Sequence, residues 1–117
     1  LAPRVRSRIE AAAKSSGLAI SAISFWEAAM LQQRRRIALV RPLAEWRRLI
    51  LDAPGIRELP VTGDEALEAV SLPGRLHADP ADRILVATAR LQRCTLVTRD
   101  ERLLEYAETG HVEALRA

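Results

Sequence analysis

Apolar residues along this chain occur in two patterns, short continuous runs and repeats at helical spacing. The runs predict three buried strands and one short edge strand, at 18–23, 56–61, 94–98 and 112–115. The repeats predict helices between them, over 3–17, 24–36, 42–52, 62–70, 79–91 and 100–107. Strands joined by helical crossovers are typical of a parallel sheet with helices on both faces, so the predicted fold class is α/β.

Three of these helices are predicted to begin with a cap. Ser24 and Glu27, and again Thr62 and Glu65, have the spacing of a capping box. Asp79 precedes a proline, which suits the first position of a helix. The caps therefore place the starts of the second, fourth and fifth helices.

The composition is that of one globular domain over residues 1–117. Apolar residues make up 49% of the chain and charged residues 28%, which excludes a disordered chain. Only 3% are aromatic, so the core must be aliphatic. The single cysteine, Cys94, excludes an internal disulfide and a cysteine-rich zinc site, and a lone thiol suits the cytoplasm, where we expect the protein. No apolar run has the length of a membrane span, so no membrane association is expected.

Arginine dominates the positive charge. Lys and Arg total 18 against 15 Asp and Glu, a net charge of +3, and Lys14 is the one lysine. The planar guanidinium suits phosphate groups, so the charge permits a nucleic-acid partner without demonstrating one. A run of three arginines at 34–36 is explained as well by a solvated helix end as by phosphate binding.

Three carboxylates lie near the ends of predicted strands. Glu27 comes one turn after the first strand, Asp100 two residues after the third, and Asp82 in the first turn of the helix that leads into the third. Ligands of open α/β sheets bind beyond the carboxyl ends of the strands, so we expect these side chains to converge. Clustered carboxylates favour Mg²⁺ or Mn²⁺, which activate water and stabilise the leaving oxygen of a phosphodiester.

Each of these carboxylates also has a purely structural interpretation. Glu27 completes a capping box, and the helix dipole alone favours Asp82 in a first turn. Asp79 and Asp100 are placed to cap the helices that follow them. Only the joint placement at one sheet edge favours a metal site over these local roles.

Two segments carry a family resemblance. HADPADRILVATA at 77–89, followed by LVTRD at 96–100, closely resembles PIN domains, above all the VapC-type toxins of bacterial toxin–antitoxin pairs. ISAISFWE at 20–27 is similar to the second motif of that family. The resemblance extends over nearly the whole chain and implies a three-layer α/β/α PIN-like fold. It also implies an endoribonuclease, a hydrolase that depends on Mg²⁺ or Mn²⁺, is neutralised by an antitoxin protein and commonly forms a homodimer.

The resemblance also implies individual roles. Carried over by position, it assigns catalysis and metal binding to three residues, Glu27, Asp82 and Asp100. Asp79 is implied as a supporting residue, as is Thr98, which would hydrogen-bond a ligating carboxylate or water. Two arginines flank the site and are candidates either for binding the RNA backbone or for balancing the carboxylates, Arg83 and Arg99.

The start of the chain departs from the family pattern. PIN domains begin with a strand that ends in Asp-Thr or Asp-Ser, and that aspartate is the first metal ligand. This chain begins at Leu1 without such a segment, so we expect the first strand to be missing from it. That strand would lie between those at 18–23 and 95–98, so we expect the gap to be filled or the sheet rearranged. Direct pairing of those two strands would contradict the PIN strand order.

Two alternatives to a ribonuclease stay open. A catalytically inactive PIN-like module that binds RNA or protein is favoured by the absent aspartate. A small phosphotransfer or nucleotide-binding domain would use the same carboxylates, but the chain has no Gly-rich phosphate loop. Of the other residues, Trp46 lies in an apolar stripe at helical spacing and is expected in the core. If that stripe were exposed, it would instead suit an antitoxin helix or a dimer partner. Cys94 is interpreted as packing and His77 as a loop histidine.

Overall fold

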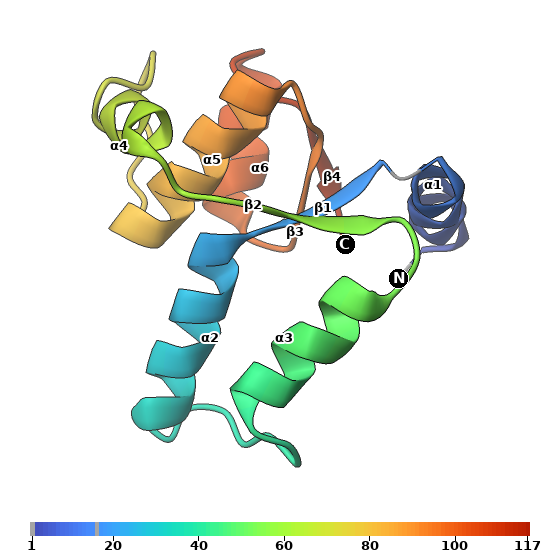
Figure 1. Cartoon of the computed structure of the whole chain (residues 1–117). Helices are drawn as coiled ribbons and strands as arrows, with labels where there is room; N and C mark the ends of the chain where they lie inside the picture. Colours follow the sequence, from blue (N-terminus) through green and yellow to red (C-terminus); the bar gives the residue numbers. More distant parts are fainter. Residues whose placement is uncertain (1, 16) are drawn as a thin grey trace. The chain divides into compact units, whose positions relative to one another are not determined.

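A computed structural model describes residues 2–15 and 17–117 of the chain, which form six helices and four strands within these ranges. Along the chain the elements are α1 (Pro3–Lys14), β1 (Leu18–Ser21), α2 (Ala22–Gln33), α3 (Leu43–Asp52), β2 (Ile56–Leu59), α4 (Gly63–Val70), α5 (Pro80–Gln92), β3 (Leu96–Thr98), α6 (Glu101–Glu108) and β4 (Ala114–Arg116) (Figure 1). The predicted α/β class is confirmed.

The chain divides into two compact units. Unit 1 consists of residues 2–6 and Val61–Ala117, and unit 2 of Ser7–Pro60. That residues 1–117 form a single domain therefore stays a prediction. No helix in the described part of the chain is long and apolar enough to cross a membrane.

Unit 2 is built on one pair of parallel strands. β1 and β2 lie side by side, with Leu18 opposite Ile56 and Ser21 opposite Leu59, and α2 and α3 connect them along the chain (Figure 1). Contacts between the two helices include the guanidinium of Arg47, which lies 5.8 Å from the centre of the Phe25 ring. No described residue of either helix is buried.

The start of α2 differs from the prediction. The first strand ends at Ser21, and the hydroxyl of Ser21 accepts a hydrogen bond from the backbone N–H of Ile23 at 3.2 Å. Ser21 is therefore the N-cap, and the capping box predicted for Ser24 and Glu27 is wrong. Either serine has the chemistry of a cap, but only Ser21 has the extended backbone that an N-cap needs.

Unit 1 holds the hydrophobic core. α4 and α5 pack against each other, and α6 adds the fully buried Leu103 and the buried Tyr106. The core is aliphatic as predicted apart from the tyrosine, and its members are Ala69, Leu72, Leu76, Val86, Ala87, Ala89, Leu103, Tyr106 and Val112. Two predicted caps are confirmed here, the box of Thr62 with Glu65 and the N-cap Asp79.

The second strand pair, β3 with β4, also lies in unit 1 and is parallel. β3 is shorter than predicted, because Cys94 takes part in the turn that ends α5. Its backbone N–H donates to the carbonyl of Ala89 at 2.9 Å, after Arg93 has turned into the left-handed region. The described strands thus form two separate two-stranded sheets, one in each unit. The order of the strands at 18–23 and 95–98 across the two units stays a prediction.

Candidate active site

The start of α5 brings two carboxylates together. Asp79 caps the helix, accepting a hydrogen bond from the backbone N–H of Asp82 at 2.9 Å. A carboxylate oxygen of Asp79 and one of Asp82 lie within 4.8 Å of each other. Pro80 at the first helical position leaves no N–H to satisfy, so this turn is locally stable. The sequence thus places two acidic side chains on one turn through ordinary capping chemistry.

Asp100 follows β3 in the same unit but lies outside that grouping. It caps α6, with Oδ1 accepting from the backbone N–H groups of Arg102 at 2.8 Å and Leu103 at 3.4 Å. The hydroxyl of Thr98 accepts a hydrogen bond from the backbone N–H of Asp100 at 3.1 Å, and its bond to a ligating carboxylate or water stays a prediction. Thr98 therefore shapes the turn that carries Asp100.

Glu27 lies on α2 of unit 2, half-buried, in the second turn of the helix. Because Asp82 and Asp100 belong to unit 1, the convergence of all three carboxylates on one metal ion stays a prediction.

The two candidate arginines have different surroundings. Arg83 is half-buried on α5 and donates two hydrogen bonds to backbone carbonyls, from Nε to Ala69 at 2.8 Å and from Nη1 to Leu76 at 2.7 Å. Arg99 is exposed directly beside Asp100. Of the two arginines, Arg99 is the one whose side chain is exposed to solvent and therefore accessible to a substrate.

The donor set at the start of α5 fits a hard divalent cation. The grouped donors are carboxylate oxygens, and no Cys or His belongs to the group among the described residues. Oxygen-only donors are typical of Mg²⁺ and Mn²⁺ sites, whereas structural zinc sites use sulfur and nitrogen. Two carboxylates this close repel each other, and a bound cation would remove that repulsion.

Sequence reasoning missed the residues that hold the neighbouring connection, 71–79. Besides the bond from Arg83 to the carbonyl of Leu76, the hydroxyl of Tyr106 donates to the carbonyl of Pro73 at 2.6 Å. Burial of Tyr106 raises the pKa of its phenol, which therefore stays a donor across the neutral range. A lone tyrosine in an apolar helix pattern was the available signal, since a buried hydroxyl needs a partner.

Comparison with known proteins agrees with the resemblance of the motifs. The chain is similar to Ribonuclease VapC22 of Mycobacterium tuberculosis (strain ATCC 25618 / H37Rv), with 41% identity over 86 residues. The aligned region covers 74% of this chain, and the chain spans 65% of the length of that curated relative. No solved structure matches the chain. The family model of the PIN domain matches residues 2–109, nearly the full chain, and the chain therefore belongs to the PIN domain family.

Proposed function

We propose that this chain is the nuclease domain of a VapC-type toxin, which hydrolyses phosphodiester bonds in RNA with Mg²⁺ or Mn²⁺. The observation that carries the proposal is the pair of carboxylates at the start of α5, Asp79 and Asp82, in a chain of the PIN domain family. The name of the relative, a ribonuclease, supports the same reaction.

The proposed cation ligands are Asp82 and Asp100 of unit 1 and Glu27 of unit 2. When bound, the cation supplies an activated water and stabilises the leaving oxygen. Asp79 keeps the first turn of α5 in place by capping it, and Thr98 holds the backbone of Asp100. The exposed Arg99 beside Asp100 is proposed to contact a phosphate of the RNA backbone.

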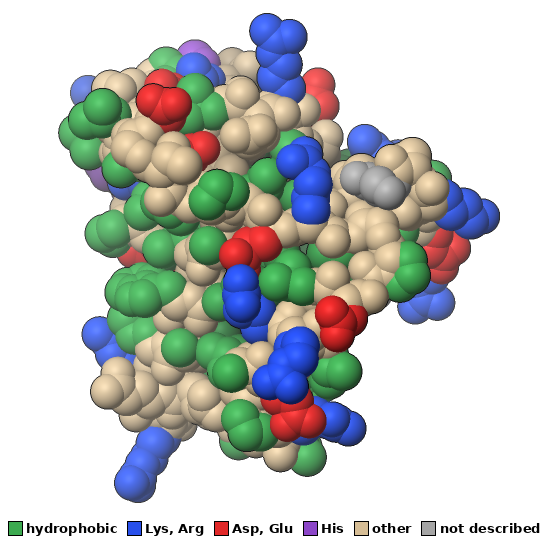
Figure 2. Space-filling model, in the orientation of Figure 1, with side chains coloured by type: hydrophobic (Ala, Val, Ile, Leu, Met, Phe, Trp, Pro, Cys, Tyr) green, Lys and Arg blue, Asp and Glu red, His purple; other side chains and the backbone are tan. Residues whose placement is uncertain are grey.

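A protein partner is proposed on unit 2. Trp26 of α2 is 54% exposed and Leu49 of α3 is 46% exposed, and Trp46 is exposed as well, contrary to its expected place in the core. Apolar and arginine side chains lie interspersed on the molecular surface (Figure 2). We propose that the antitoxin covers this apolar part of unit 2, that the toxin forms a homodimer, and that both proteins act in the cytoplasm.

One observation favours the alternative, a catalytically inactive PIN-like module that binds RNA or protein. The Asp100 carboxylate is engaged by the start of α6, and its Oδ2 lies 3.5 Å from the guanidinium of Arg102. A carboxylate with only a capping role would leave the proposed cation one ligand short.

The deciding experiment measures cleavage of end-labelled single-stranded RNA with Mg²⁺ or Mn²⁺ and with chelator. Asp82→Asn and Asp100→Asn are each expected to lower the cleavage rate by about 100-fold or more, with unchanged melting temperatures. Asp64→Asn is the matched control, because Asp64 is an exposed acid in the first turn of α4 and has no proposed role. RNA binding without metal-dependent cleavage would establish the inactive module instead.

A further inference from the structure

The connection between α4 and α5 has no regular secondary structure but is held at defined points. It spans residues 71–79, includes the exposed His77 and ends at the capping Asp79. Leu72 and Leu76 anchor it in the core of unit 1. Tyr106 holds it at Pro73.

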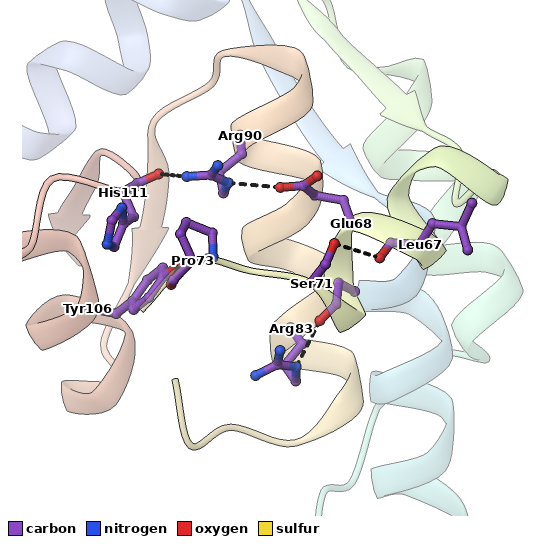
Figure 3. A network of polar contacts seen from close by, with 9 residues as sticks. Leu67, Glu68, Ser71, Pro73, Arg83, Arg90, Tyr106 and His111 are labelled. Atoms are coloured by element: carbon purple, nitrogen blue, oxygen red, sulfur yellow. Dashed lines mark hydrogen bonds and ion pairs between the residues drawn. The ribbon is translucent and has the colours of Figure 1, made fainter. Parts of the chain in front are cut away.

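Arg83 ties this connection to the helix that carries Asp82. Figure 3 shows the Arg83 side chain below the end of α4, and its Nε donates to the carbonyl of Ala69 at 2.8 Å. Its Nη1 donates to the carbonyl of Leu76 at 2.7 Å. Ala69 lies in the last turn of α4, where carbonyl groups have no partner within the helix. One side chain therefore joins the end of α4, the middle of the connection and the first turns of α5.

We propose that Arg83 is a positioning residue that keeps Asp79 and Asp82 in place for the cation, and that it does not bind RNA. The path is short, because Arg83 follows Asp82 in α5 and holds Leu76 three residues before Asp79. Asp79 in turn accepts the backbone N–H of Asp82, so movement of the connection would separate the two carboxylates. This inference rests on the proposed metal-dependent nuclease.

A comparison of arginine with lysine at position 83 distinguishes a positioning role from phosphate binding. A guanidinium presents several N–H groups in a rigid fork, so it reaches two carbonyls at once. The single ammonium group of lysine keeps the charge but does not reproduce this fork. A phosphate contact depends mainly on charge and survives replacement by lysine far better.

The test uses Arg83→Lys and Arg83→Gln in the whole protein. Arg75→Lys and Arg75→Gln are matched controls, because Arg75 is an exposed arginine in the same connection. Three quantities are measured: Mn²⁺ affinity by calorimetry, amide hydrogen exchange, and the salt dependence of binding to single-stranded RNA. Both Arg83 variants are expected to bind Mn²⁺ at least about 5-fold more weakly and to exchange faster across 71–79. Their salt dependence should match that of the unmodified protein, and the Arg75 variants should bind Mn²⁺ normally.

Two results would overturn the inference alone. In the first, Arg83→Lys behaves like the unmodified protein while Arg83→Gln loses RNA affinity and about one unit of salt slope, which identifies a phosphate contact. In the second, Mn²⁺ affinity is unchanged although exchange is faster, which leaves Arg83 a purely structural role. An unmodified protein that binds no Mn²⁺ and cleaves no RNA would instead overturn the proposed function, and this inference with it.

Discussion

The two units of this protein bury their apolar residues to different extents. Unit 1 contains a continuous core around Val86 and Leu103, while in the described part of unit 2 only Leu59 and Ser21 are buried. Yet eight of the twelve residues of α2 in unit 2 are apolar, although none of its described residues is buried. An apolar helix is more often found in the interior of a protein. Unit 1 is stabilised by its own side-chain packing, whereas the apolar residues of α2 and α3 in unit 2 remain at least partly exposed.

The largest expected effect tests the packing of unit 1. Leu103 is 1% exposed, so Leu103→Ala is expected to lower the free energy of unfolding by about 4 kcal/mol through lost burial and a cavity. Leu49→Ala, at a half-exposed position on α3, is expected to cost about 0.5 kcal/mol. Urea unfolding of both variants measures the difference. Equal losses would contradict the contrast between the units.

The second prediction concerns the backbone of unit 2. Gly55 has φ +84°, and a Cβ there would lie 2.0 Å from the carbonyl oxygen of Ala13. Gly55→Ala is therefore expected to cost about 3 kcal/mol, since both the conformation and the space exclude a side chain. Gly110 in unit 1 has φ +88° with nothing within 4 Å, so Gly110→Ala should cost about 1 kcal/mol. Thermal unfolding ranks the two, and a milder effect at Gly55 would refute the steric argument.

A smaller effect distinguishes buried from exposed polar contacts. Tyr106→Phe removes the donor to the Pro73 carbonyl and is expected to cost about 1.5 kcal/mol. Arg47→Met in unit 2 breaks an exposed ion pair with Glu58, whose N–O distance is 2.8 Å, and is expected to destabilise the protein less than Tyr106→Phe, because water screens the pair. The two variants are compared by the midpoints of their urea unfolding curves, provided that the m-values are equal. A larger loss at Arg47 would mean that unit 2 depends on its surface charges.

The smallest effect is a difference in response to pH and salt. Hydrogen bonding lowers the pKa of two carboxyls, Glu65 through the hydroxyl of Thr62 and Glu58 through the guanidinium of Arg47. A lowered folded-state pKa stabilises the protein above the unfolded value of about 4.3, and this stabilisation is lost as pH falls through the folded value. Glu65→Gln and Glu58→Gln should therefore destabilise the protein at neutral pH, and each variant should approach the unmodified protein in stability once the pH has fallen below the lowered folded-state pKa. Concentrated salt should reduce only the effect at Glu58, because it screens an ion pair. Equal salt sensitivity at both positions would count against this assignment.

Local chemistry explains which parts of the fold the sequence predicts well. The caps at Thr62, Asp79 and Asp100 depend on a side chain and backbone groups two or three residues away, so the pattern alone indicates them. The strand ends were less accurate, because an apolar residue such as Ile23 suits a buried strand and a helix equally.

The sequence by itself determined the α/β class, the acidic residues available to a metal, and the family motif that includes them. Only the tertiary structure decided the partners of Arg83 and Tyr106. The carbonyl groups that they bind lie 7 to 33 residues away along the chain, and every residue except proline offers the same backbone groups. The sequence pattern therefore does not indicate which backbone carbonyl a side chain will bind. The packing of α4, α5 and α6 in unit 1 determines which carbonyls Arg83 and Tyr106 reach.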